Sequence, residues 1–125
     1  MSVYRQYLEV CEKPWGVYYV YEDTPSYKLK RLVVNPGQRL SLQSHQFRLE
    51  HWFVIKGEAT VEIEDEQGKI NKSKLSVGEK CFIPLKAKHR LSNESEEVLE
   101  IIEIQMGTYF GEDDIIRYED DYNRI

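Results

Sequence analysis

The stretch GQRLSLQSHQFRLEHWFVIKG, residues 37–57, decides the fold, because its polar centre lies between two segments that alternate as strands do. Gln43 and His45 are two positions apart, so on a strand their side chains point to the same face. A hairpin return brings Glu50 back beside them, and the glycine at each end of the stretch permits a turn. The stretch is therefore either a solvated hairpin loop or part of a ligand set inside a barrel.

A second stretch, GEKCFIPLKAKHRLSN at residues 78–93, supplies a further candidate ligand, His89. Two imidazoles, a carboxylate and an amide oxygen form a donor set that suits Zn²⁺ best, with Mn²⁺, Fe²⁺, Co²⁺ or Ni²⁺ as alternatives. We predict that a divalent metal is bound by four residues, Gln43, His45, Glu50 and His89. The competing interpretation is that each is an ordinary loop or surface residue. His51 has the opposite parity to Glu50 and should point away from the ligands.

The rest of the chain shows period-two alternation, clearest at residues 27–34, 50–57, 59–65 and 97–105. These segments are rich in β-branched and aromatic residues, are separated by turn signals, and are accompanied by no long helical period. We therefore predict an all-β sandwich or barrel that forms a single domain over residues 1–125.

The two ends of the chain give separate expectations. Residues 1–14 should form an N-terminal edge strand. Residues 111–125 form an acidic tail, which either contains a helical turn or extends into solvent, and the acidic run at residues 119–121 should be solvated.

Net charge, hydropathy and cysteine spacing limit the classes of protein to which this chain can belong. The net charge is −5, with basic residues scattered among acidic ones, which argues against a nucleic-acid binder but allows an anionic small substrate. No apolar run has the length of a membrane span or the form of a signal peptide, so we expect a cytoplasmic protein without a membrane partner. Cys11 and Cys81 lack ligand-type spacing and should be reduced thiols.

Residues 37–57 and 78–93 resemble the two signature segments of the cupin superfamily, G-x5-H-x-H-x3-4-E-x6-G and G-x5-P-x-G-x2-H-x3-N. The resemblance implies the double-stranded β-helix, or jelly-roll barrel, of that superfamily. It also implies a metal, although Gln43 stands at the first histidine and Lys86 at a glycine.

A closer resemblance covers nearly the whole chain, from about Lys13 to Arg124. The motifs Y-K-x-K-R, L-S-L-Q-x-H, R-x-E-H-W, H-R-L-x-N and G-E-D-D-I occur in the order found in the type II phosphomannose isomerase domain. That domain usually follows a mannose-1-phosphate guanylyltransferase part in bifunctional enzymes, a part this sequence does not contain. The resemblance implies a free-standing, metal-dependent isomerase that interconverts mannose 6-phosphate and fructose 6-phosphate. The chain departs from the family mainly at Gln46 and Phe47, where the family has histidines, and at Lys13 and Lys86.

The implied reaction needs a base that moves a proton between C2 and C1. Glu103 is the first candidate, since it shares its parity with Leu99 and Ile101 and burial would raise its pKa. The alternative is that Ile102 and Ile104 face the core and Glu103 faces solvent. Lys30 is the second candidate, as a proton shuttle or an electrostatic partner, with a solvated lysine as its alternative.

Substrate contacts follow from the same implied reaction. Ser41 shares the parity of Gln43 and could bind a sugar hydroxyl, and Arg48 and Arg90 are the predicted phosphate ligands, with Arg31 as a further candidate. Two rival functions stay open: a non-catalytic cupin that binds a sugar phosphate or nucleotide sugar, and other metal chemistry such as dioxygenation. We also expect a homodimer, with the strand VYRQYLEV at residues 3–10 at its interface.

Overall fold

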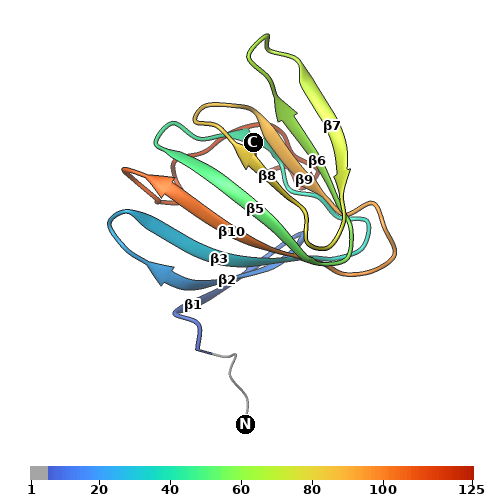
Figure 1. Cartoon of the computed structure of the whole chain (residues 1–125), viewed down its shortest axis with the longest axis horizontal. Coiled ribbons are helices and arrows are strands. Elements are labelled where there is room, and N and C mark those ends of the chain that lie inside the picture. Colours follow the sequence, from blue (N-terminus) through green and yellow to red (C-terminus); the bar gives the residue numbers. More distant parts are fainter. Residues whose placement is uncertain (1–5) are drawn as a thin grey trace.

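The computed structural model describes residues 6–125, which form two antiparallel sheets packed face to face (Figure 1). The six-stranded sheet has the order β1-β2-β3-β10-β5-β8, and the five-stranded sheet has the order β11-β4-β9-β6-β7. The strands are β1 (Glu9–Lys13), β2 (Gly16–Asp23), β3 (Tyr27–Val34), β4 (Leu42–Ser44), β5 (Arg48–Lys56), β6 (Ala59–Glu64), β7 (Ile70–Leu75), β8 (Lys80–Ile83), β9 (His89–Ser92), β10 (Leu99–Gly107) and β11 (Ile116–Glu119). The predicted all-β class is confirmed, since the described residues contain no helix.

The long strands of the six-stranded sheet form where the sequence alternates. β3 coincides with the predicted segment 27–34, and every second side chain along it is buried. β5 and β10 show the same alternation over nine residues each and pair with one another in register, Gln105 opposite Glu50 and Glu103 opposite Trp52. Because successive side chains point to opposite faces, this pattern places one row of each strand inside the sandwich.

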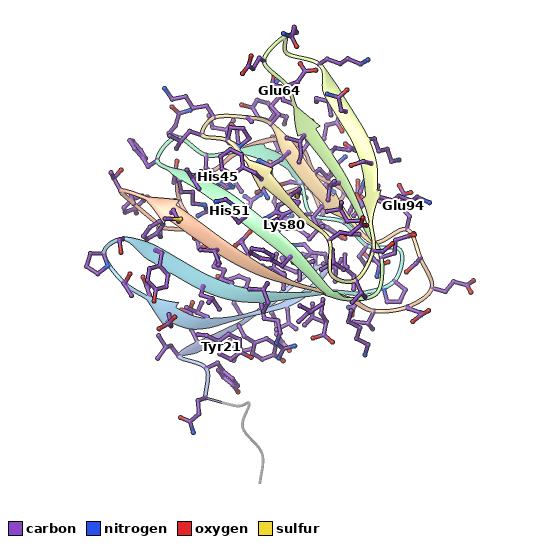
Figure 2. The ribbon with its side chains drawn as sticks, viewed as in Figure 1. Tyr21, His45, His51, Glu64, Lys80 and Glu94 are labelled. Carbon is purple, nitrogen blue, oxygen red and sulfur yellow. The ribbon has the colours of Figure 1, made fainter. Side chains whose placement is uncertain are left out.

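The interior between the sheets has an apolar half and a polar half. Along β5 the inward side chains change from polar to apolar in the order Arg48, Glu50, Trp52 and Val54. Along the antiparallel β10 they change in the reverse sense, in the order Leu99, Ile101, Glu103 and Gln105. Antiparallel pairing therefore brings the polar ends of both rows to the same end of the sandwich, and side chains fill the space between the sheets (Figure 2).

The N-terminal segment is an edge strand over its described part. β1 pairs with β2 at the margin of the six-stranded sheet, as predicted. Residues 1–5 of the predicted edge strand, and so the beginning of the stretch 3–10, lie outside the described residues.

The C-terminal segment differs from both expectations for it. β11 pairs with β4 at the edge of the five-stranded sheet, so this part of the tail is a strand and not a helical turn or a solvated extension. The predicted solvated run at residues 119–121 is held by arginines, since the carboxylates of Asp120 and Asp121 accept from Arg124 and Arg39 at 2.8 Å. Neutralisation by Arg124, four positions along the chain, and by Arg39, distant in sequence, explains why an acidic segment can pack on the sheet.

Two smaller expectations concern the thiols and membranes. Cys11 and Cys81 are both free, and burial raises the pKa of the Cys81 thiol to about 12. Within residues 6–125, nothing helical has the length and apolar character needed to cross a bilayer.

Candidate metal centre and its cavity

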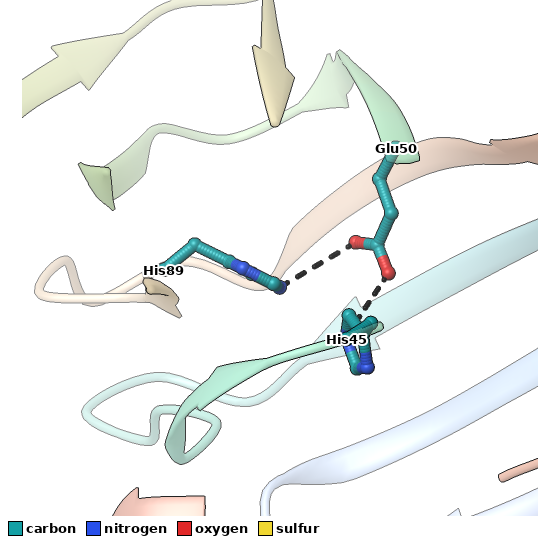
Figure 3. Close-up of side chains that lie close together, drawn as sticks. All are labelled: His45, Glu50 and His89. Carbon is teal, nitrogen blue, oxygen red and sulfur yellow. Dashed lines mark ion pairs between the residues drawn. The ribbon is translucent and has the colours of Figure 1, made fainter. Parts of the chain in front are cut away.

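Three of the predicted ligands converge in the polar half of the interior. Glu50 on β5 lies between His45, directly after β4, and His89, at the start of β9 (Figure 3). Its two carboxylate oxygens are 3.3 Å from Nε2 of His45 and 3.8 Å from Nε2 of His89. The three potential ligand atoms lie within 4.8 Å of one another, and all three residues are buried. One ion could therefore contact all three side chains.

Each histidine presents its Nε2 atom to this centre, because its other nitrogen is engaged with the backbone. His45 Nδ1 lies 2.6 Å from the carbonyl oxygen of Asp114, and His89 Nδ1 lies 2.9 Å from that of Ala87. Burial lowers the pKa of His45 to about 4 and also lowers the pKa of His89, so both rings are neutral near pH 7. Among the described residues, Nε2 of the buried His89 has no hydrogen-bond partner. A neutral imidazole with a free Nε2 is the form that binds a metal.

Gln43 completes the set predicted from the sequence. It pairs in register with His89 across β4 and β9, is 9 % exposed, and lines the same cavity as Glu50. The hydroxyl of the buried Ser41 donates to Gln43 Oε1 at 3.4 Å. Ser41 thus lies beside the proposed ligand, where it orients the amide oxygen.

Arg48 shares the atoms that a cation would use. Its Nε donates to a Glu50 oxygen at 3.0 Å, and one terminal nitrogen lies 3.3 Å from His45 Nε2. Burial alone would raise the pKa of Glu50, but the charge of Arg48 outweighs it and holds that pKa below its ordinary value. The donor set fits a divalent metal, with the condition that the Arg48 guanidinium turns away from Nε2 when the ion binds.

Glu103 is the second buried carboxylate of the cavity. Trp52 Nε1 lies between the carboxylates and donates to Glu50 at 3.0 Å and to Glu103 at 3.1 Å, while Gln105 donates to Glu103 at 2.7 Å. Burial, with the nearby charge of Glu50, raises the pKa of Glu103 to about 8. Of the two parities considered for β10, the one that buries Glu103 with Leu99 and Ile101 is therefore confirmed.

Lys30 is buried and faces the same cavity, so the alternative of a solvated lysine is wrong. Its Nζ donates to Glu112 at 2.7 Å and lies 4.1 Å from the ring centroid of Tyr18. Burial would raise the pKa of Glu112, but the ammonium of Lys30 outweighs it and lowers that pKa. Lys30 and Glu112 are thus an ion pair at the wall of the cavity.

Arg90 does not lie where it was predicted. It follows His89 directly along β9, so its side chain points to the opposite face of the sheet and does not line the cavity. There its guanidinium donates to the carbonyl oxygen of Leu40 at 2.9 Å and to Glu119 at 3.1 Å. The further candidate, Arg31, lies on the outer face of the other sheet and donates to Glu100 at 2.6 Å.

Other basic residues line the cavity instead: Lys13, Arg117 and Arg124. Nε of Arg117, on β11, is buried without a hydrogen-bond partner in the described part of the chain. Lys13 was noted in the sequence only as a departure from the family. Arg117 and Arg124 belong to the acidic tail, and that tail reaches the cavity through the pairing of β11 with β4.

His51 and Lys86 lie near the candidate ligands but outside the ligand set. The His51 ring packs against Phe82 with centroids 5.0 Å apart and, as expected, does not join the ligands. Lys86, at the family's glycine position, has φ of 68°, in the left-handed region, and its amide donates to the His45 carbonyl oxygen at 2.9 Å.

Solved structures share this architecture at low sequence identity. Capsular polysaccharide assembling protein CapF from Staphylococcus aureus matches 89% of this chain and 34% of its own, with a TM-score of 0.77 at 17% identity. An oxalate oxidase in complex with glycolate matches 74% of this chain and 46% of its own, with a TM-score of 0.66 at 21% identity. These likenesses show that the chain has a cupin fold, as predicted.

Curated relatives are much closer in sequence. Xanthan biosynthesis protein XanB of Xanthomonas campestris pv. campestris (strain B100) is 44% identical over 112 residues, which are 90% of this chain and 23% of the relative. A mannose-1-phosphate guanylyltransferase of Klebsiella pneumoniae is 39% identical over 123 residues, 98% of this chain and 25% of the relative. The chain thus spans about a quarter of the length of these relatives. The family described as "Mannose-6-phosphate isomerase C-terminal" matches residues 2–120. With its cupin fold and this nearly full-length match, the chain belongs to the mannose-6-phosphate isomerase C-terminal domain family.

Proposed function

We propose that the protein is a metal-dependent isomerase that interconverts mannose 6-phosphate and fructose 6-phosphate. The observation that carries the proposal is a single cavity in which Glu50 of the His45–Glu50–His89 cluster lies beside a second buried carboxylate, Glu103. Membership of the family supports the proposal. The part of the relatives that this chain matches is a quarter of their length, so their whole activities are not carried over.

The metal would be held by four side chains, those of Gln43, His45, Glu50 and His89. When bound, a divalent cation supplies Lewis-acid stabilisation of the oxygens that carry charge in an enediolate. Two neutral imidazoles with one carboxylate and one amide oxygen favour Zn²⁺ in this role.

Glu103 is the proposed base that carries the proton between C2 and C1. A carboxylate whose pKa lies near the working pH transfers protons in both directions, as a reversible isomerisation requires. Trp52 and Gln105 hold the Glu103 carboxylate in place through hydrogen bonds. Lys30 stays paired with Glu112 and acts as the electrostatic partner of the cavity.

The phosphate group would be bound by Arg48 and Arg117. Nε of Arg117 and NH1 of Arg48 are both buried, and neither atom has a hydrogen-bond partner among the described residues. Arg90, which is already bonded to Leu40 and Glu119, has no part in this proposal. Ser41 lines the cavity between these groups and is the proposed contact for a sugar hydroxyl.

The test is direct. The protein reconstituted with Zn²⁺ is incubated with mannose 6-phosphate, and fructose 6-phosphate is measured over time beside a His45→Ala control. We expect turnover in the wild type, none in the control, and a loss of about 10²-fold or more in kcat for Glu103→Gln. Turnover no greater than that of the His45→Ala protein would contradict the proposed function.

The second candidate is a non-catalytic cupin that binds a sugar phosphate. It is favoured by the contacts of Arg48 with His45 Nε2 and Glu50, because these contacts engage the atoms that a metal needs. Calorimetry that shows tight mannose 6-phosphate binding without turnover would support this candidate over the isomerase.

We propose that the protein acts in the cytoplasm, because phosphorylated sugars are charged and do not leave the cell unaided. We also propose that it is a homodimer. The outer face of the six-stranded sheet supports the dimer, since one row across four strands consists of Tyr19, Arg31, Ile102 and Phe53. Within these four strands the single charge, Arg31, is already paired with Glu100, and the exposed Lys80 opposite Phe53 lies on the edge strand β8, where it can stay in solvent when an identical face packs on the row. Tyr21, labelled in Figure 2, marks the outer side of this sheet.

The dimer is tested by light scattering at micromolar concentration. We expect a dimeric mass for the wild type and a monomeric mass for Ile102→Lys, with Ile70→Lys on the exposed β7 as the matched control that stays dimeric. A monomeric wild type would contradict the proposal.

A further inference from the structure

The loop that carries His45 is held through its backbone. Gln46 and Phe47 are exposed, and the Phe47 side chain, 53 % exposed, packs edge-on against the exposed Tyr109, so neither side chain is held by the interior. Their amides donate to the two carboxylate oxygens of Asp114, Gln46 N to Oδ1 at 2.9 Å and Phe47 N to Oδ2 at 3.0 Å. Asp114 itself is only 8 % exposed. A single buried carboxylate therefore binds two successive amides directly after a candidate metal ligand.

The same residue also orients the imidazole. The carbonyl oxygen of Asp114 is 2.6 Å from His45 Nδ1. A carbonyl oxygen only accepts hydrogen bonds, so Nδ1 must carry the proton and Nε2 must carry the lone pair that faces Glu50. On the other side of the loop, the Lys86 amide donates to the His45 carbonyl oxygen at 2.9 Å. The main chain and the ring of His45 are thus held from two directions.

We propose that Asp114 is the positioning residue of the metal centre, which fixes the ring and the tautomer of His45 through three hydrogen bonds to residues 45–47. The inference rests on the proposed metal site and names a residue outside its ligand set. Because two of the three bonds end on backbone amides, the arrangement does not depend on which side chains stand at positions 46 and 47. This is the physical reason why Gln46 and Phe47 can replace the family's histidines without loss of the centre.

The expected magnitude follows from the general behaviour of residues that orient metal ligands. Their replacement weakens metal binding by about 10–100-fold. Hydrogen bonds to an ionised acceptor are roughly twice as strong as neutral ones, so the two amide bonds of Asp114 hold the loop more firmly than an amide side chain could. Asp114→Asn keeps one side-chain acceptor oxygen and should retain part of the affinity. Asp114→Ala keeps no side-chain acceptor, although the backbone carbonyl that faces His45 Nδ1 remains.

The experiment measures Zn²⁺ alone, by competition with a chromophoric chelator, on full-length variants whose folding is checked by circular dichroism. We expect Asp114→Ala to weaken Zn²⁺ binding by about 10–100-fold and Asp114→Asn to fall between it and the wild type. Asp113→Ala is the matched control, because Asp113 is the exposed neighbour whose carboxylate, within residues 6–125, accepts only from the Tyr109 hydroxyl. It should bind Zn²⁺ like the wild type.

Substitutions in the loop distinguish the contribution of the backbone amides to Zn²⁺ binding from that of the side chains. Phe47→Pro removes one of the two amide donors and should weaken Zn²⁺ binding as Asp114→Ala does. Gln46→His and Phe47→His keep both donors and should leave the affinity within about two-fold of the wild type. Phe47→Pro and Asp114→Asn also keep the inference testable if Asp114→Ala fails to fold.

A spectroscopic readout distinguishes positioning from general support of the fold. In ¹⁵N NMR without added metal, His45 should be the Nδ1–H tautomer in the wild type. Asp114→Ala keeps the backbone carbonyl that accepts from Nδ1 but loses the two carboxylate bonds that hold this carbonyl against the loop, so a mixture of tautomers is expected there. A folded Asp114→Ala protein with wild-type Zn²⁺ affinity and an unchanged tautomer would overturn the inference. If the wild type binds Zn²⁺ but does not turn over mannose 6-phosphate, the proposed function fails while the role of Asp114 stands.

Discussion

Arg48 contacts both His45 and Glu50, so it affects both the stability of the candidate metal centre and its access to a cation. A buried carboxylate is stable only when it is paired, and Arg48 is the full positive charge within hydrogen-bond distance of Glu50. The same guanidinium competes with any cation for the lone pairs of the ligands. One side chain would thus stabilise the folded chain and weaken metal binding at the proposed site.

The first prediction follows from this competition. Arg48→Ala should lower the free energy of unfolding by about 3–5 kcal/mol, because it leaves a buried charge without its partner. It should also tighten Zn²⁺ binding, since the ion then neutralises Glu50 without a competitor. Chemical denaturation and chelator competition measure the two effects. Lys72→Ala, which breaks the exposed pair with Glu94, is the control and should change stability by no more than about 1 kcal/mol. Weaker Zn²⁺ binding in Arg48→Ala would contradict the competition.

Lys86 gives a second prediction at the scale of one residue. Its φ of 68° lies in the left-handed region, which costs a residue with a Cβ atom about 1–2 kcal/mol relative to glycine. Replacement by glycine would remove this cost, but part of the stability gained is offset by the greater freedom of glycine in the unfolded chain. Lys86→Gly should therefore raise the free energy of unfolding by about 1 kcal/mol.

The control for this position is Lys80→Gly in β8, which lies in a strand with ordinary backbone angles and should lose stability. Urea denaturation of both variants measures the difference. A Lys86→Gly protein no more stable than the wild type would show that the left-handed conformation at residue 86 is not strained.

At the scale of elements, the C-terminal segment matters more than its composition suggests. β11 closes the edge of the five-stranded sheet, brings Arg117 to the cavity, and is preceded by the turn that contains Asp114. After the strand, the carboxylate of Asp120 accepts from Arg124 Nε at 2.8 Å and from the Arg124 amide at 2.7 Å. The segment is therefore anchored on both sides of β11.

This anchor predicts a pH dependence of stability. The hydrogen bonds from Arg124 lower the pKa of Asp120 to about 2, below the value of about 3.9 for an unfolded aspartate. A lowered folded-state pKa stabilises the folded chain above pH 4, and that contribution is lost as the pH falls from about 4 to 2. Asp120→Asn should therefore be less stable than the wild type at pH 6, and the two should converge near pH 2.

Urea denaturation at a series of pH values measures this convergence. Arg124→Ala removes the other half of the anchor and should follow the same course. A constant difference between Asp120→Asn and the wild type from pH 6 to pH 2 would contradict the ionic origin of the anchor.

For the whole molecule, the consequence of the fold is a barrel that concentrates polar groups at one end of its interior. Such a polar interior is unfavourable for folding unless its polar atoms have partners, and a bound ion would supply the partner that His89 Nε2 lacks among the described residues. Metal binding and global stability should therefore be linked.

The linkage gives the final prediction. Zn²⁺ at 100 times its dissociation constant should raise the free energy of unfolding by about 2.7 kcal/mol. Thermal unfolding with and without the ion measures this gain. His89→Ala should abolish the gain, while His51→Ala, whose ring lies against Phe82 away from the ligands, should keep it. An equal gain in both variants would show that the ion binds elsewhere.

Local patterns in the sequence were enough to predict the long strands and to single out the candidate ligands. Alternation specified β3, β5 and β10, because a period of two is a property of each strand alone. The spacing of Gln43, His45 and Glu50 within one hairpin, and a single later histidine, were enough to predict a shared site. The parity rule that correctly set His51 aside also applied to Arg90, which follows His89 directly, so that error could have been avoided from the sequence.

Tertiary structure decided what lies around those ligands. Whether Glu103 or its neighbours face inward depends on which face of β10 meets the other sheet, and local alternation is the same in both cases. The roles of Asp114 and Arg117 depend on the pairing of β11 with β4, which joins segments about seventy positions apart. Alternation acts between neighbours along the chain, whereas the surroundings of a ligand are set by strand pairing and by charge neutralisation across the folded barrel.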